Sequence, residues 1–355
     1  MRLLICAGGT GGGVYPALTV AERLNDSAEI LWVGGEGGME AGLVQREGLR
    51  FEAIPAAGVH GVSLAKLPGN GWKLWKGYLK SKAILKQFKP DVLFFTGGYV
   101  AIPMALAATG LCKLLFVPDI EPGLALKTLA RFSDRVALTV ESSRDYFEHK
   151  EKTIVTGYPL RESLGKWTRE AGLEYFGFDP SLPVVLFTGG SSGARSINEA
   201  VLAIAPQLVQ TCQVIHLTGH LGWEAVQAAS QNFGPRYQAF PYLHEIGAAY
   251  AAASLVVSRS GASSLGEYPY FALPAILVPY PYAWRYQKIN ADYLVDAGAA
   301  MLLEDSRLKS ELLPSIRGLL GKPLELAAMS SAMGALNRPQ AAEAIAALIY
   351  EMAEA

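Results

Sequence analysis

The stretch AGGTGGGVYPAL at residues 7–18 joins an apolar run at residues 2–6 to a helix-like run at residues 19–24. Glycine has no Cβ, so a glycine turn between a strand and a helix lets backbone N–H groups approach a ligand closely. The helix that follows adds the positive end of its dipole, which suits the turn to binding a phosphate. The spacing is neither G-x-G-x-x-G nor a P-loop, because no Lys-Ser or Lys-Thr closes it. Taken alone, it is equally typical of an ordinary turn.

Two further glycine turns follow apolar, strand-like runs. FTGGYVAIP occupies residues 95–103, and FTGGSSGARSIN occupies residues 187–198. The later turn carries side chains that can donate to phosphate oxygens or sugar hydroxyls, namely Ser191, Ser192 and Asn198. Three strand, glycine-turn and helix units on one chain favour a nucleotide or phosphate ligand over coincidence.

Composition limits the classes of protein. A chain of 355 residues exceeds the size at which one core keeps growing, so we expect two domains. The net charge of −1 argues against nucleic acid as a bulk partner. Cys6, Cys112 and Cys212 are far apart and form no metal-ligand spacing, which favours a reducing cytoplasm without disulfides or structural zinc. We also expect neither a signal peptide nor a membrane-spanning helix.

One segment is strongly basic. No acidic residue lies between Glu52 and Asp91, while lysines alternate there with aromatic and aliphatic side chains. Tryptophans beside lysines are typical of an anchor on anionic lipid, and the expected membrane patch comprises Trp72, Lys73, Trp75, Lys76 and Lys80. The alternative is a surface helix whose apolar stripe packs on the sheet, and that stripe would be Leu74, Tyr78, Leu85 and Phe88. The two interpretations are compatible.

Strands alternate with helices along the whole chain. The expected strands lie near residues 2–7, 29–34, 91–96, 113–117, 135–139 and 152–156, and then near 183–188, 213–218, 236–240, 254–258, 274–279 and 299–303. This alternation predicts an α/β protein with two doubly wound, Rossmann-like parallel-sheet domains facing a cleft. We expect the domains at 1–160 and 161–338, with a C-terminal helix at 339–355 whose return to the first domain stays open.

A further candidate site lies in the second half, where residues 253–267 predict a strand, a Ser-Gly-Ala turn and a helix start. A carboxylate at Glu267 can accept hydrogen bonds from both vicinal hydroxyls of a ribose, while backbone N–H groups of the turn bind a diphosphate. An exposed helix glutamate is the alternative. Gln287 and Asn290 place two amides on one helix face, suited to sugar hydroxyls or to capping.

The ordered set of motifs resembles the MurG-like N-acetylglucosaminyltransferases, family 28 of the GT-B glycosyltransferases. The matching stretches are GGTGGGVYPAL at 8–18, GGYVAIP at 97–103, GYPLR at 157–161, GGSSGARSIN at 189–198, RSGASSLGE at 259–267, LPAILVPYP at 273–281 and YQKINA at 286–291. The resemblance implies a GT-B fold. It also implies inverting transfer of N-acetylglucosamine from UDP-N-acetylglucosamine to a polyprenyl-diphosphate-linked acceptor, lipid I, giving lipid II for peptidoglycan at the inner face of the cell membrane.

The resemblance also suggests which residues bind which substrate. It assigns the backbone of Leu243 to uracil, Glu267 to the ribose and Gln287 to the sugar hydroxyls. The expected donor set is Arg161, Ser191, Ser192, Asn198, Leu243, Ala262, Ser263, Glu267, Gln287 and Asn290. The expected acceptor-diphosphate set is Thr10, Gly11, Gly12, Gly13, Gly97, Gly98 and Tyr99.

The chain departs from the family pattern on the acceptor side. Gly13 stands where the family's first turn ends in histidine, Phe116–Asp119 replaces an H-E-Q-N stretch, and Tyr286 replaces the histidine of an H-Q-x-x-N element. No D-x-D stands in a loop, so we expect no metal and no cofactor. The leaving diphosphate would then rest on backbone N–H groups and helix ends.

Asp119 is the first candidate for the general base, followed by Glu121 and His60. A structural role for Asp119, capping the next helix, is the alternative. Three competing functions stay open: transfer to another lipid acceptor, a UDP-N-acetylglucosamine 2-epimerase of the same architecture, and a weakened sugar-nucleotide-binding paralogue. The basic segment favours a lipid acceptor over the epimerase, whereas the missing histidine favours the paralogue.

Overall fold

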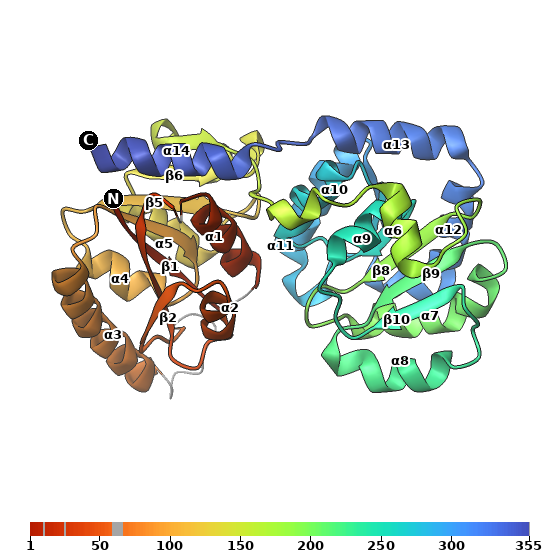
Figure 1. Cartoon of the computed structure of the whole chain (residues 1–355), viewed down its shortest axis with the longest axis horizontal. Helices are drawn as coiled ribbons and strands as arrows, with labels where there is room; N and C mark the ends of the chain where they lie inside the picture. The colour runs from red at the N-terminus through yellow and green to blue at the C-terminus, as the bar shows by residue number, and fades with distance from the viewer. Residues whose placement is uncertain (10, 25, 59–66, 355) are drawn as a thin grey trace. The chain divides into compact units, whose positions relative to one another are not determined.

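The computed structural model describes residues 1–9, 11–24, 26–58 and 67–354, and it divides into two compact units (Figure 1). Unit 1 comprises Met1–Leu160 and Pro339–Ala355, and unit 2 comprises Arg161–Arg338. The chain therefore passes between the units twice. The final helix lies on unit 1, where Arg23 Nε is 3.0 Å from Glu343 Oε1.

Unit 1 contains a seven-stranded parallel sheet in the order β3-β2-β1-β4-β5-β6-β7. Its strands are β1 (Arg2–Ala7), β2 (Glu29–Gly35), β3 (Arg50–Ile54), β4 (Val92–Gly97), β5 (Cys112–Val117), β6 (Arg135–Leu138) and β7 (Thr153–Val155). Its helices are α1 (Gly11–Leu24), α2 (Glu40–Arg46), α3 (Leu67–Phe88), α4 (Ala101–Ala107), α5 (Leu124–Phe132) and α14 (Ala341–Glu354), with 3-10 helices η2 (Glu141–Tyr146) and η3 (Lys150–Lys152). The central strands are buried on both faces, as continuous apolar runs require.

Unit 2 contains a six-stranded parallel sheet in the order β10-β9-β8-β11-β12-β13. Its strands are β8 (Val184–Thr188), β9 (Gln213–Leu217), β10 (Tyr237–Phe240), β11 (Leu255–Ser258), β12 (Ala275–Leu277) and β13 (Ala300–Leu302). Its helices are α6 (Arg169–Phe176), α7 (Arg195–Leu208), α8 (Trp223–Ser230), α9 (Ile246–Ala252), α10 (Glu267–Tyr270), α11 (Trp284–Asp296), α12 (Leu308–Leu320) and α13 (Pro323–Ala335). Its 3-10 helices are η4 (Glu162–Leu164), η5 (His220–Gly222), η6 (Ala262–Leu265), η7 (Pro281–Ala283) and η8 (Asp305–Arg307).

The strand order puts the glycine turns at the switch point of each sheet. In each sheet the winding direction reverses beside the first strand of the unit, between β1 and β4 in unit 1 and between β8 and β11 in unit 2. Ligands of doubly wound sheets bind outside the carboxyl ends of the strands at this switch point. All four turns singled out in the sequence leave these four strands at that end.

The prediction of two doubly wound parallel sheets is confirmed. The sequence missed one strand, β3, because Arg50–Ile54 is a short edge strand whose side chains are mostly half-buried and carry no continuous apolar run. Among the described residues, no helix is both long and apolar enough to cross a membrane.

Candidate functional site

The two glycine turns of unit 1 pack backbone against backbone. Gly97 and Gly98 have φ values of 118° and 85°, a region that favours glycine. A Cβ on Gly98 would overlap the carbonyl oxygen of Gly8, and Thr96 Oγ1 donates to the carbonyl of Gly13 at 2.7 Å. The described residues of the turns after β1 and β4 are therefore in direct contact.

The remaining acceptor-side residues lie on these turns. Gly11 and Gly12 open α1 and are half-buried, and Tyr99 is exposed beside the second turn. Thr10 and His60 lie outside the described residues. Gly13 is buried within α1, and a Cβ there would lie 3.2 Å from the Thr96 carbonyl oxygen. A histidine at this position would need the neighbouring turn to shift.

A buried carboxylate that the sequence analysis missed supports the first glycine turn. Glu40 is 1% exposed, and its carboxylate accepts hydrogen bonds from the N–H of Gly35 at 2.7 Å and of Gly9 at 3.4 Å. A Cβ on Gly8 or Gly38 would collide with it. The signal was the run GGEGGMEAG at residues 34–42, whose glycines leave room for this side chain.

The candidate bases follow β5 and lie in different environments. Asp119 is half-buried at the end of that strand. Glu121 is 2% exposed, and Lys127 Nζ lies 3.6 Å from its Oε1. This ion pair makes Glu121 the weaker candidate, because an acceptor hydroxyl must reach the base directly or through one water.

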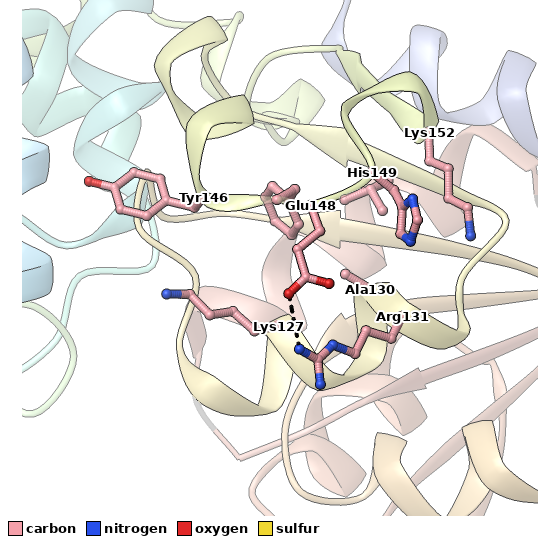
Figure 2. Close-up of a pocket in the computed structure, with 9 residues that line it drawn as sticks. Lys127, Ala130, Arg131, Tyr146, Glu148, His149 and Lys152 are labelled. Carbon is pink, nitrogen blue, oxygen red and sulfur yellow. Dashed lines mark hydrogen bonds and ion pairs between the residues drawn. The ribbon is translucent and has the colours of Figure 1, made fainter.

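A surface pocket of unit 1 lies between α5 and the segment around η2 and η3. Figure 2 shows Lys127 near Tyr146 and a dashed ion pair between Arg131 and Glu148. The Lys127 amine lies 5.6 Å from the Tyr146 ring centre, and Arg131 and Glu148 are 3.2 Å apart. Among the described site candidates, none lines this pocket. Its cations are paired locally, and we assign it no role.

In unit 2, the third glycine turn joins β8 to α7. Gly190 and Gly193 have φ values of 81° and 78°, and Gly193 packs directly on the carbonyl of Thr218. Ser191 and Ser192 are exposed at the tip of this turn. Helix α7 begins at Arg195, so its free N–H groups and dipole face the same side as the two serines.

Asn198 makes hydrogen bonds within unit 2 that the sequence did not predict. Its Nδ2 donates to the Thr218 carbonyl at 2.9 Å, and its Oδ1 lies 2.9 Å from His216 Nε2. His216 Nδ1 is in turn 2.6 Å from the Tyr237 hydroxyl. Burial lowers the pKa of His216 to about 3, so the ring is neutral and donates to Asn198 while accepting from Tyr237. Asn198 thus holds the Thr218 carbonyl beside the third glycine turn, and its contact with the donor stays a prediction.

Glu267 is the central candidate of unit 2. It begins α10 half-buried, and the Tyr250 hydroxyl donates to its Oε2 at 2.8 Å. Burial raises the pKa of Glu267, while the hydrogen bond from Tyr250, the charge of Arg161 and a hydrogen bond from Ser263 act in the opposite direction. The structure therefore brings Arg161, Ser263 and Glu267 together, and their role in a donor site stays a prediction.

The other donor candidates divide into two groups. Leu243 and Ala262 are buried, so only their backbones are suited to contact a ligand. Gln287 Oε1 accepts from the Tyr280 N–H at 2.8 Å, which orients the amide nitrogen as its donor end. Asn290 is fully buried and donates to the Ser260 carbonyl at 3.1 Å. Asn290 therefore attaches α11 to the Ser-Gly-Ala turn, and its contact with the donor stays a prediction.

Arg259 is a second residue that the sequence analysis missed. Its guanidinium donates to the carbonyls of Val278 and Pro279 at 3.0 and 3.2 Å and to Ser196 Oγ at 2.9 Å, and it pairs with Asp305 at 2.6 Å. Arg259 thereby connects the turn after β11 to the end of β12 and to the start of α7. The signal was an arginine at the end of a buried strand, where a charge requires partners.

Comparison with known proteins identifies the family. Residues 3–138 match the glycosyltransferase family 28 N-terminal domain, and residues 184–345 match the glycosyltransferase family 28 C-terminal domain. A relative from Roseiflexus sp. (strain RS-1), a UDP-N-acetylglucosamine--N-acetylmuramyl-(pentapeptide) pyrophosphoryl-undecaprenol N-acetylglucosamine transferase, is 38% identical over 98% of this chain and 94% of its own length.

Solved structures agree with this result. The crystal structure of Acinetobacter baumannii MurG matches with a TM-score of 0.77 at 26% identity, covering 99% of both chains. A UDP-GlcNAc 2-epimerase from Neisseria meningitidis matches with a TM-score of 0.71 at 15% identity over 99% of this chain and 100% of that chain, which shows the shared fold alone. The chain belongs to glycosyltransferase family 28, among the MurG N-acetylglucosaminyltransferases.

Proposed function

We propose that the protein is an inverting glycosyltransferase that moves N-acetylglucosamine from UDP-N-acetylglucosamine to lipid I, giving lipid II for peptidoglycan. The observation that carries this proposal is the full-length similarity to transferases named for that reaction, at 38% identity. The geometry supports it, because each unit carries two turns at its switch point. These turns are suited to binding two phosphate-bearing substrates, one in each unit.

Unit 2 is the proposed donor site. Glu267 accepts hydrogen bonds from the ribose hydroxyls, and the exposed turn with Ser191 and Ser192 offers backbone and hydroxyl donors to the diphosphate. Arg161, whose charge already acts on Glu267, adds positive charge near the same place. In this proposal the Leu243 backbone contacts uracil and the Gln287 amide contacts the sugar.

Unit 1 is the proposed acceptor site, with the acceptor diphosphate on the turns after β1 and β4. Inverting transfer needs a base at the acceptor hydroxyl and stabilisation of the charge that develops on the leaving UDP. We assign the base to Asp119, the more exposed carboxylate of its segment. The leaving diphosphate is stabilised by N–H groups of the third glycine turn and of the Ser-Gly-Ala turn, both pre-organised by their packing.

Helix α3 is the proposed membrane contact. Trp72 and Trp75 are 59% and 51% exposed, and Lys76 Nζ lies 5.5 Å from a Trp72 ring centre. The other face buries Leu85 and Phe88 against unit 1. The helix therefore packs through its apolar stripe and leaves a tryptophan and lysine face for an anionic membrane, which in this proposal is the inner face of the cell membrane.

A transfer assay tests the proposal. The purified protein is incubated with UDP-N-acetylglucosamine and either lipid I, other polyprenyl-diphosphate acceptors or glycerolipids, and UDP release and the product are followed. We expect UDP release with lipid I and a product heavier by one N-acetylglucosamine. Transfer only to another lipid would reassign the acceptor. UDP binding without transfer to any lipid would favour the binding paralogue, which Gly13 in place of the family's histidine also suggests.

A further inference from the structure

We propose that Tyr250 is a positioning residue of the donor site, whose hydroxyl holds the Glu267 carboxylate in the orientation that receives the ribose. This inference rests on the proposed function only in taking Glu267 as the ribose ligand. Tyr250 lies 17 residues upstream of Glu267, on α9. Nothing in its sequence context separates it from an ordinary core tyrosine.

Ring packing and one hydrogen bond orient the side chain of Tyr250. Its side chain is buried, and its ring centre lies 5.7 Å from that of Tyr268 and 5.6 Å from that of Phe271. The hydroxyl ends at Glu267 Oε2, 2.8 Å away. Burial, and then the charge of Glu267, raise the pKa of Tyr250 well above its ordinary value. The phenol therefore stays protonated and always donates to the carboxylate.

A carboxylate that contacts two vicinal hydroxyls must be held in one rotamer, and this is the task of Tyr250. Glu267 opens a helix of only four residues, so its own element restrains it weakly. The groups that face it are Tyr250 from α9, Ser263 from η6 and Arg161 before η4, and its charge also acts on Tyr268 of its own helix. Tyr250 bonds to one oxygen, Oε2, and in this proposal the remaining lone pairs of the carboxylate accept the ribose hydroxyls.

Tyr268 provides a matched control. It is also a buried tyrosine of the same cluster, but its hydroxyl donates to Ser258 Oγ at 2.7 Å and not to Glu267. Tyr250→Phe and Tyr268→Phe therefore remove the same atom from the same kind of environment. Only the first change takes a hydrogen bond away from the carboxylate.

Calorimetry of UDP binding to the full-length protein tests the proposal. We expect Tyr250→Phe to weaken UDP by about 3- to 10-fold, the effect of one hydrogen bond, and Tyr268→Phe to change it by less than about 2-fold. With 2′-deoxy-UDP, Tyr250→Phe should weaken binding no more than Tyr268→Phe does, because the ribose contact on which Tyr250 acts is then incomplete. In the transfer assay, KM for UDP-N-acetylglucosamine should rise with kcat unchanged.

The pH dependence and Glu267 itself separate the outcomes. Loss of the hydrogen bond should move the acidic loss of UDP binding to higher pH in Tyr250→Phe, because Tyr250 acts against the raised pKa of Glu267. Unchanged UDP affinity in Glu267→Ala would overturn the ribose assignment, and with it this part of the proposed function. A weakened Glu267→Ala beside an unchanged Tyr250→Phe would overturn the positioning role alone, as would equal losses in the two tyrosine variants.

Discussion

The assignment of Asp119 as the general base can be tested by changing one side chain. Asp119→Asn keeps the size of the side chain but removes the basic oxygen, so we expect kcat to fall by about 10²- to 10⁴-fold with UDP affinity unchanged. Single-turnover transfer to lipid I measures the first quantity, and calorimetry the second. Glu121→Gln is the matched comparison, because Glu121 is already paired with Lys127. Normal turnover of Asp119→Asn on the true acceptor would place the base elsewhere.

His216 makes the stability of unit 2 depend on pH. Its pKa is about 3 in the folded protein and about 6.5 in the unfolded chain, so between these values the unfolded chain binds more protons. The stabilisation is complete above about pH 6.5 and falls as the pH drops, by about 1.4 kcal/mol per unit at most. Urea unfolding at pH 4, 5, 6 and 7 should show a shallower dependence in His216→Gln. The exposed His220→Gln should retain the original slope, and parallel curves for His216→Gln would contradict the assignment.

Residue types at the turns could be predicted from the sequence, but their partners could not. The sequence indicated both Glu267 and Arg161, and the structure places them close enough to interact, while their contact with a donor stays a prediction. The hydrogen bonds that Asn198 and Asn290 donate to the Thr218 and Ser260 carbonyls could not be predicted, because these partners lie 20 and 30 residues away in the sequence. Glu40 was missed because one of its partners is the backbone of Gly9, 31 residues away.

The first glycine turn depends on a side chain of another element. Glu40 on α2 binds the N–H groups of Gly9 and Gly35, so Glu40→Ala leaves both without this partner. We expect the free energy of unfolding to fall by about 1–3 kcal/mol, because the two N–H groups lose hydrogen bonds to a buried charged acceptor. Urea denaturation measures it, and the exposed Glu36→Ala on the same segment is the control. Equal stability of the two variants would show that the turn does not need the carboxylate.

Helix α3 should bind anionic lipid through its exposed lysines. We expect co-sedimentation with phosphatidylglycerol vesicles at low salt and release as salt rises, since each lysine contributes about 1 kcal/mol near a charged surface. Replacing Lys73, Lys76 and Lys80 together by Gln should abolish this binding. The same change at the exposed Lys166, Lys309 and Lys322 of unit 2 removes equal charge and should not. Equal binding to neutral and anionic vesicles would refute the electrostatic contribution.

Element order was largely readable from the sequence because parallel strands are long apolar runs between turns. The edge strand β3 was missed because one side of it has no neighbouring strand, which relaxes the demand for apolar residues. The sequence left open where the last helix packs. It packs on α1 through a face that buries Ile345 and Ile349, and it adds an ion pair between Arg23 and Glu343, contacts between opposite ends of the chain that no local pattern predicts.

The division into two units predicts how ligands change the whole molecule. The chain connects the units only at Leu160–Arg161 and at Arg338–Pro339. A ligand that binds one folded unit stabilises that unit by mass action, by about 2.7 kcal/mol at 100 times its Kd. Units that open independently should therefore respond separately to the donor and to lipid.

Hydrogen exchange on the full-length protein measures this response. With saturating UDP, core amides of unit 2, such as those of β8 and β11, should exchange up to about 100-fold more slowly, and those of β1 and β4 should keep their rates. Anionic vesicles should slow exchange in α3 alone. Glu267→Ala at the same UDP concentration is the control, because it should lose most of the protection in unit 2. Equal slowing of exchange in both sheets would mean that the units open together. Protection confined to unit 1 would contradict the assignment of the donor site to unit 2.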